Sequence, residues 1–395
     1  MEMDYEVRIE SIAAGGAGVG RIEGKTVFVD GCVAGETVIC RIVEDRRSWS
    51  RAKLLEIKEA SPDRTRPACT YYGLCGGCNM QHLSYPAQLA AKTAILKDAF
   101  FRIGGINPPE PKVFPSSPWE YRNRMQFHCI KQSHDPQFGL KAKKSDEIVS
   151  VSDCPIADPG IRRFLKGEAE QPFHPPPGKD RFTVYARDGV FLGEGGIQRG
   201  KTRILDRELV VDTGVFFQSN GMMLEKLLTD LRGIAAGTGG MVRNLPMADL
   251  YCGMGIFAVF LGDLFPHADL VEENKTALGL AHENFLSLVS DDENAASNIS
   301  ADFFAQRVED WIKKTNCHRY GFFVADPPRQ GLASVVSRRL AAGGPPYFVY
   351  VSCDCATLAR DSKILLEGGY KLEELRLYDF YPQTAHIETL AVFVR

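Results

Sequence analysis

Two cysteines stand two positions apart in the segment VSCDCATLARD, residues 351–361. The apolar run before them is typical of a buried strand, so Cys353 is expected where that strand ends. A cysteine held as a thiolate is a covalent nucleophile. The segment therefore predicts a reactive thiol, and by itself it leaves open whether Cys353 or Cys355 reacts.

A glycine-rich turn offers a second kind of chemistry. In ADLYCGMGIF an apolar strand runs into Gly253 and Gly255 and then into a helix, so the backbone can bend sharply and approach a ligand. About twenty residues later the next strand ends in Glu272 and Glu273, and an acid there can accept hydrogen bonds from a ribose diol. Together these features indicate an adenosine-containing cofactor, with a purely structural turn as the alternative.

Three cysteines lie close together in the segment ACTYYGLCGGCNMQ, at Cys69, Cys75 and Cys78. Thiolates on a glycine-rich loop can hold an iron–sulfur cluster, because glycines leave amide donors free for the sulfides. Four thiolates also make a structural zinc site. The chain has 11 cysteines, and this odd number argues against a disulfide scaffold. The spacing favours metal binding without deciding which metal.

Composition limits the class of protein. With 44% hydrophobic and 25% charged residues over 395 positions, we expect a soluble protein of two or three domains. No apolar run is long enough to span a membrane, and MEMDYEVRIE opens with acids rather than a secretory signal. We therefore expect a cytoplasmic protein without a membrane partner, and a monomer by default. The net charge of −3 neither supports nor excludes nucleic acid, which only local basic patches could bind.

The elements that must position these residues fall into three parts. Residues 1–60 show short alternating apolar stretches between GGAGVG and GCVAGE, a pattern typical of a small antiparallel barrel. Residues 61–210 predict a central α+β part, with an amphipathic helix in YPAQLAAKTAILKDAFFRI. Residues 211–395 alternate strands and helices, as in a parallel sheet covered by helices. There Asp326 follows a strand, where open α/β sheets place ligand-facing loops.

Basic residues beside aromatic ones suggest contact with RNA. They occur in EDRRSWSR, in WEYRNRMQFH and in KAKK, and comprise Arg46, Arg47, Trp49, Arg51, Tyr121, Arg122, Arg124, Phe127 and residues 141–144. Such surfaces bind phosphates and stack bases. Solvated hairpins and strand faces are the alternative.

Five motifs together resemble one family, the S-adenosylmethionine-dependent RNA uracil-5-methyltransferases. They are FFQSN (216–220), DLYCGMGIF (249–257), DPPRQG (326–331), SCDCATLARD (352–361) and HIET (386–389). The likeness covers nearly the whole chain, in the order and approximate spacing of the family. It implies an α/β fold with a C-terminal Rossmann-like methyltransferase domain, a central α+β domain, and an N-terminal OB-like barrel similar to the RNA-binding TRAM domain.

The resemblance implies a covalent mechanism. C5 of uracil is a poor nucleophile, and a thiolate that adds at C6 makes it reactive toward a sulfonium methyl group. Cys353 corresponds to the family's nucleophile and Glu388 to its general base, whose pKa would be raised by its apolar strand. Cys355 stands where the family usually has proline, which is expected to loosen the loop and to place a second oxidisable thiol beside the first.

The same resemblance assigns the cofactor and metal positions. Glu272 is preferred over Glu273 because it lies three positions before Lys275 and twelve before Asn284, as in the family. The residues implied for S-adenosylmethionine are Gln218, Tyr251, Gly253, Gly255, Glu272 and Asp326. Those implied for a metal are Cys69, Cys75, Cys78 and Cys154, and here the resemblance favours a [4Fe-4S] cluster over zinc.

The expected partner is RNA, and ribosomal RNA of the 23S type is favoured over transfer RNA by the combination of a TRAM-like barrel with these cysteines. The segments 165–180 and 288–300 could tune that choice. Two other functions stay open. Cytosine-5 methylation also uses cysteine addition, although its second cysteine is missing from the DPPRQG loop. A non-catalytic RNA-binding protein is the other.

Overall fold

A six-stranded barrel forms the N-terminal part of the computed structural model, which describes residues 3–130, 138–168, 176, 178–290 and 299–395. Its strands are β1 (Asp4–Arg8), β2 (Ser11–Ile12), β3 (Gly18–Ile22), β4 (Lys25–Val29), β5 (Thr37–Asp45) and β6 (Trp49–Glu59), in the order β1-β5-β6-β4-β3-β2. The pairs are antiparallel except β4 with β6, which run parallel. Alternate residues such as Val27 and Val29 fill the interior. The predicted barrel is present, with one parallel pair.

The central part is a second antiparallel sheet with an aromatic core. Its elements are β8 (Arg124–Cys129), β9 (Phe138–Lys141), β10 (Ile148–Val149), α2 (Pro159–Leu165), β11 (Arg181–Arg187) and β12 (Val190–Gly193), followed by the hairpin of β13 (Arg199–Ile204) and β14 (Arg207–Asp212). Phe127, Phe138, Phe164 and Phe182 contact one another, and this aromatic packing gives the small sheet its core.

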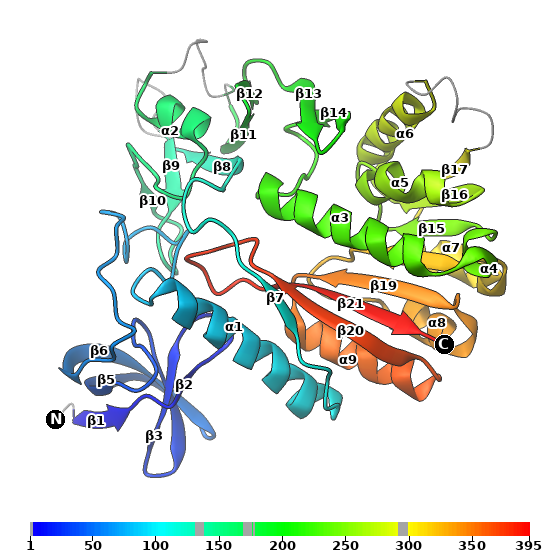
Figure 1. The fold of residues 1–395 in the computed structure, drawn as a ribbon. Helices are drawn as coiled ribbons and strands as arrows, with labels where there is room; N and C mark the ends of the chain where they lie inside the picture. Colours follow the sequence, from blue (N-terminus) through cyan, green and yellow to red (C-terminus); the bar gives the residue numbers. More distant parts are fainter. Residues whose placement is uncertain (1–2, 131–137, 169–175, 177, 291–298) are drawn as a thin grey trace.

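An eight-stranded sheet in the order β17-β16-β15-β18-β19-β21-β20-β7 organises the C-terminal part (Figure 1). Its strands are β15 (Met247–Leu250), β16 (His267–Glu272), β17 (Ser300–Ala305), β18 (Phe322–Ala325), β19 (Tyr347–Ser352), β20 (Lys371–Tyr378), β21 (Glu388–Val394) and β7 (Lys112–Phe114). Strands β15 to β19 are parallel, as predicted, and β21 is antiparallel to both β19 and β20.

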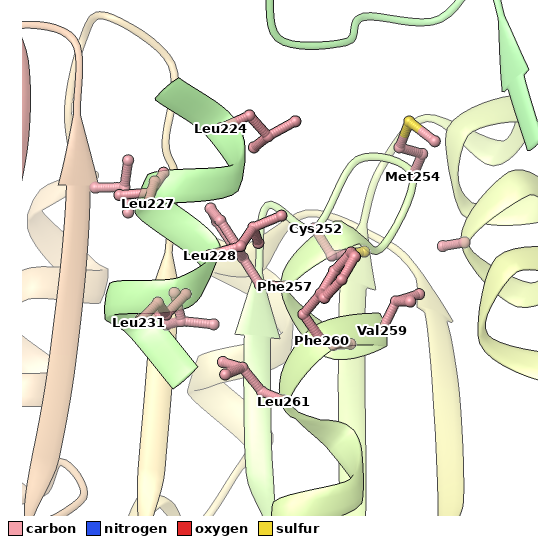
Figure 2. Packing of buried hydrophobic residues seen from close by; sticks show 14 of the residues in the cluster. Leu224, Leu227, Leu228, Leu231, Cys252, Met254, Phe257, Val259, Phe260 and Leu261 are labelled. Atoms are coloured by element: carbon pink, nitrogen blue, oxygen red, sulfur yellow. The ribbon is translucent and has the colours of Figure 1, made fainter. Parts of the chain in front are cut away.

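Helices cover both faces of this sheet. They are α3 (Gly221–Gly237), α4 (Gly240–Arg243), α5 (Ile256–Leu261), α6 (Lys275–Ser290), α7 (Val308–Lys314), α8 (Ser334–Gly343) and α9 (Cys355–Glu367), with short 3₁₀ turns at Gly262–Leu264 and Cys317–Arg319. Helices α3, α5 and α6 share one apolar core with the sheet, and α7, α8 and α9 share the other. Figure 2 shows the leucines of α3 opposite Phe257 and Phe260 of α5, beside the turn that carries Cys252 and Met254.

Helix α1 (Tyr85–Ala99) continues as a π-helical turn over Phe100–Gly104 and packs against α9. Ile95, Leu96 and Phe100 belong to the same apolar core as α9, and β7 pairs with β20. Residues 85–114 therefore join the C-terminal sheet, although they lie within the range 61–210 predicted as a central part. The buried side of α1 also includes two polar residues, Gln88 and Lys92, which a purely amphipathic helix would not bury.

Among the described residues, none of the helices combines the length and the apolar character needed to cross a lipid bilayer. The segments predicted to tune the choice of RNA are 165–180 and 288–300. Most of their residues, namely 169–175, 177 and 291–298, lie outside the described residues.

Candidate active site

A cavity of about 1130 Å³ lies at the ends of the parallel strands. Residues at the ends of four strands that are adjacent in the sheet line it. Tyr251 follows β15, Asp326 follows β18, Cys353 follows β19, and Glu272 is the last residue of β16. Glu388 enters from β21, which begins at the same edge because it is antiparallel to β19. Carboxyl ends of parallel strands meet at one edge of a sheet, which is why residues so far apart in the chain share this cavity.

The glycine-rich turn shapes one end of the cavity. Gly253 has a φ of +55°, and a Cβ added there would meet no atom within 4 Å, so the turn leaves open space beside its backbone. Gly255 does not line the cavity. A Cβ there would lie 2.8 Å from the Cβ of Ala281, so this glycine allows α6 to approach. Tyr251 also has a positive φ, of 60°, which is unusual for a tyrosine. This residue lines the cavity as well.

Glu272 is fastened to this turn. Its two carboxylate oxygens accept hydrogen bonds from the backbone N–H groups of Gly253 at 3.1 Å and Asn274 at 2.7 Å. Glu273 lines the same cavity, but the two backbone N–H groups that hold the turn donate to Glu272 instead. Asn284 lies away from the cavity and bonds to the backbone of Val210 and Met254, so its contribution is to hold the turn in place.

Two carboxyl groups that line the cavity, those of Glu388 and Asp326, have raised pKa values. Glu388 is 2% exposed, and its Oε1 has no hydrogen-bond partner among the described residues. Burial raises the pKa of this carboxyl well above its usual range, with the charge of Asp326 adding to the effect. Burial also raises the pKa of Asp326 to about 7. The side-chain amide of Gln218 donates to Asp326 Oδ2 at 3.4 Å. A buried carboxylate with a raised pKa is suited to taking a proton.

The two thiols of the opening motif have different surroundings. Cys353 is half-buried and lines the cavity, whereas Cys355 is 8% exposed and belongs to the apolar core that includes Leu358. Burial, together with the charges of Glu388 and Asp326, raises the pKa of Cys353 to about 11, and the charge of Arg329 opposes this rise. Cys353 is also next to the N-terminus of α9, whose dipole favours a thiolate.

Cys355, expected to stand where the family has proline, is the first residue of α9. Asp354 is the N-cap of this helix, and its Oδ1 accepts the backbone N–H of Thr357 at 2.9 Å. Proline is common at that first helical position because the N–H there has no partner within the helix. The cap holds this end of the loop, so Asp354 already fixes the position where the resemblance leads us to expect proline and the chain has Cys355.

A second cavity, of about 670 Å³, lies between the barrel and the cysteine-rich loop. Cys75, Cys78 and Cys154 line it, and Cys69 is close enough for its charge to raise the pKa of the Cys75 and Cys154 thiols. The backbone N–H of Gly77 donates to Cys75 Sγ at 3.4 Å, the kind of amide donor that a metal-bound thiolate accepts. The four predicted cysteines are thus gathered in one place.

The distances between these sulfurs can be compared with those of a zinc site. Tetrahedral zinc with Zn–S bonds of about 2.3 Å holds its sulfurs about 3.8 Å apart. Within the described residues, the only three ligand atoms of His, Cys, Asp or Glu that lie within 4.8 Å of one another are in His267, Asp269 and Asp302, away from the cysteines. No three of the four cysteine sulfurs therefore lie within 4.8 Å of one another, and this separation by itself selects neither zinc nor an iron–sulfur cluster.

Comparison with known proteins decides the family. The model of the family described as tRNA (Uracil-5-)-methyltransferase matches residues 198–395. The chain belongs to this family. A TRAM domain model matches residues 4–55, which confirms the predicted nature of the barrel.

Relatives of this methyltransferase align along its whole length. An RNA methyltransferase of Treponema denticola is 32% identical over 392 residues, which cover 94% of each chain. A 23S rRNA (uracil(1939)-C(5))-methyltransferase of Pectobacterium atrosepticum is 29% identical and aligns with 98% of this chain and 93% of its own. The crystal structure of a tRNA (uracil-54, C5)-methyltransferase of Pyrococcus abyssi, in complex with S-adenosyl-L-homocysteine, has a TM-score of 0.73 at 21% identity and covers 99% of this chain and all of its own. This last match confirms the predicted fold, that of S-adenosylmethionine-dependent methyltransferases.

Several residues of the methyltransferase cavity were not singled out by sequence. They are Phe216, Arg329, Tyr381, Thr384 and His386. Arg329 donates to Nδ1 of His386 at 3.2 Å, and partial burial together with Arg329 lowers the pKa of His386 to about 4, which keeps the ring neutral. Phe216 is 61% exposed. The available signal was their position within or beside the motifs FFQSN, DPPRQG and HIET.

The predicted basic residues divide into two groups. Arg122 lines both cavities of the methyltransferase, and Arg51 and Lys144 line the second one beside Trp49. Arg124 lines the active-site cavity, but its guanidinium donates to the carbonyls of Thr213 and Val215 and lies over the Phe216 ring. Tyr121, which precedes β8, and Phe127 of β8 are both buried. Arg46 pairs with Glu44 on the barrel surface, and neither Arg46 nor Arg47 lines either cavity.

Proposed function

We propose that this chain transfers the methyl group of S-adenosylmethionine to C5 of a uridine in RNA, with Cys353 as nucleophile and Glu388 as base. One observation carries the proposal: a thiol, two carboxyl groups and an open glycine turn line a single cavity, in a chain of the uracil-5-methyltransferase family. Each of these groups comes from one chain, so a monomer suffices.

The reaction balances with the side chains available. The Cys353 thiolate adds to C6 of the uracil, and the electron pair moves to C5 and O4. S-adenosylmethionine supplies a methyl group on a sulfonium, and C5 forms its new bond to that carbon while the carbon–sulfur bond breaks. Glu388 then accepts the C5 proton, and the C6–sulfur bond breaks to restore the double bond and the thiolate. Asp326, held by Gln218, lies beside this proton transfer.

The cofactor end of the cavity supports the binding half of the proposal. Glu272 is held by the turn with its remaining lone pairs available to a ribose diol, and the space beside Gly253 admits a ligand against the backbone. Gln218 connects this end to Asp326 and suits the methionine portion. Tyr251 lines the wall between them.

Two further assignments follow the predictions. We propose a [4Fe-4S] cluster on Cys69, Cys75, Cys78 and Cys154, supported by the gathering of these four thiols around one glycine-rich loop. In the holoprotein this cluster would have a structural or RNA-docking role, because the reaction needs no electron transfer. About four iron atoms and four acid-labile sulfides per chain in protein purified without oxygen are expected, and zinc alone would refute the assignment.

The substrate we propose is ribosomal RNA of the 23S type. The support is the whole-length similarity to 23S rRNA methyltransferases, such as that of Pectobacterium atrosepticum, with which the chain shares 29% sequence identity. The cavity beside Trp49, Arg51 and Lys144 offers stacking and phosphate contacts to the strand on either side of the target. We place the enzyme in the cytoplasm, where its RNA is made.

Nucleoside mass spectrometry tests the function directly. RNA from cells that lack the gene is incubated with the protein and methyl-labelled cofactor, and the label is mapped. Label on C5 of uridine in 23S rRNA is expected. Label on transfer RNA would refute the substrate alone, label on cytosine would refute the reaction, and no label with folded, cluster-bearing protein would leave only RNA binding.

A further inference from the structure

The segment 379–387 connects β20 to β21 without a helix or strand, and yet most of it is buried. It delivers Tyr381, Thr384 and His386 to the active-site cavity and ends next to Glu388. Figure 1 shows this loop, in red, reaching past the end of the sheet toward the start of α1. A buried loop must find partners for its backbone groups elsewhere, so the question is what holds it.

Helix α1 supplies a buried ion pair. Lys92 Nζ donates to Asp379 Oδ1 at 2.5 Å and to the carbonyl of Tyr381 at 3.0 Å, and the side chains of Lys92 and Asp379 are both fully buried. A buried pair of this kind is weak support for stability, because removing both charges from water is costly. What it does fix is the distance between α1 and the beginning of the segment.

One turn earlier on α1, Gln88 makes a reciprocal contact with Gln383. Its Nε2 donates to Gln383 Oε1 at 3.0 Å, and its Oε1 accepts the backbone N–H of Gln383 at 2.9 Å. Gln383 has a φ of +67°, a left-handed conformation that costs energy in a residue with a Cβ. Such a conformation persists when surrounding contacts over-determine it, and the two bonds from Gln88 are such contacts.

Two other parts of the chain hold the same segment. The backbone N–H groups of Asn79 and Met80 donate to the carbonyl of Gln383 at 3.1 and 3.0 Å, and Asn79 Oδ1 accepts the N–H of Ala385. The hydroxyl of Tyr121 donates to the carbonyl of Pro382 at 2.8 Å. Three stretches that precede the segment by more than 250 residues in sequence thus satisfy its backbone.

We infer that Gln88, Lys92 and Tyr121 are positioning residues for uridine methylation, which fix the segment 379–387 and through it Glu388 in the active site. The inference rests on the proposed function. None of these three side chains lines the active-site cavity, and each forms a hydrogen bond to the segment, which connects it to Glu388. A displacement of about 1 Å at a reacting group lowers turnover on the order of 100-fold. Glu388 directly follows the segment 379–387, so a shift of the segment would displace it.

The test uses the full-length protein with its cofactors. The double variant Lys92→Met with Asp379→Asn removes both buried charges while keeping their approximate volumes, and Tyr121→Phe removes only a hydroxyl that no catalytic step uses. Lys97→Met is the matched control, because Lys97 lies on the same helix but pairs with Glu110 at the surface. Thermal unfolding, kcat, KM for S-adenosylmethionine and the amount of covalent protein–RNA adduct at steady state are measured for each.

The double variant is expected to lose roughly 10- to 100-fold in kcat and Tyr121→Phe several-fold, with KM for the cofactor within about twofold of wild type. Covalent adduct should accumulate on ordinary RNA, since addition by Cys353 continues while proton removal by Glu388 slows. Turnover within threefold of the Lys97→Met control in both variants overturns the inference. So does a parallel loss of kcat and cofactor binding without adduct, which marks general destabilisation. An inactive wild-type protein would instead refute the proposed function.

Discussion

Replacing Glu388 by glutamine removes the proposed base and little else. The side chain is 2% exposed, its Oε1 accepts no hydrogen bond from the part of the chain that the structure describes, and glutamine has the same shape. The repulsion between Glu388 and Asp326 disappears with the charge, so the folded protein should not lose stability. A positioned general base contributes about 10²- to 10⁴-fold to a rate, which corresponds to about 3–5 kcal/mol of activation free energy.

Loss of the base should stop the reaction at a defined point. Addition by Cys353 and methyl transfer precede proton removal, so Glu388→Gln is expected to accumulate a methylated covalent adduct with RNA that survives denaturing electrophoresis. The rate should also lose a pH dependence. Because the pKa of Glu388 is raised, the wild-type rate increases with pH as this carboxyl ionises in the folded state, and the glutamine variant should lack that rising limb.

The assay is a single turnover with tritium at C5 of the target uridine, followed by measurement of tritium release and of adduct on a gel. Glu309→Gln is the matched control, since Glu309 also lines the cavity but has no assigned role; it should release tritium normally. Cys353→Ser should give no adduct. Tritium release by Glu388→Gln within threefold of wild type, or absence of adduct with normal cofactor binding, would refute the assignment.

Three other predictions concern stability and RNA binding. Burial raises the pKa of Asp249 to about 8, so this carboxyl weakens the fold progressively from about pH 4 to pH 8, by up to about 6 kcal/mol. In denaturant titrations Asp249→Asn should lessen that decline, and equal pH slopes would contradict it. Cys355→Pro should raise stability by about 0.4–1 kcal/mol with kcat unchanged, because Asp354 is already extended (φ −138°, ψ 111°), and a lower melting temperature would count against this reading. Trp49→Ala should weaken RNA binding by about 1–3 kcal/mol in filter binding without changing cofactor affinity, and an unaltered Kd would remove Trp49 from the RNA surface.

The sequence by itself determined the site in outline. Apolar runs followed by Gly253, Asp326 and Cys353 mark the carboxyl ends of strands, and parallel strands bring those ends to one edge of a sheet. Local periodicity is enough to locate these strand ends, because a few consecutive residues specify each strand. The barrel was readable in the same way, and its match to the TRAM domain confirms that reading.

Only the tertiary structure decided which surfaces meet. Gly255 reads as a cofactor glycine, yet its missing Cβ makes room for α6. The cysteine-rich loop meets the barrel across a cavity, a contact that no local pattern encodes. Lys92 reads as a solvated residue of an amphipathic helix but is fully buried against Asp379, 287 positions later in the chain. Whether a polar side chain is buried depends on the partner that satisfies it, and that partner is chosen by the packing of distant elements rather than by neighbouring residues.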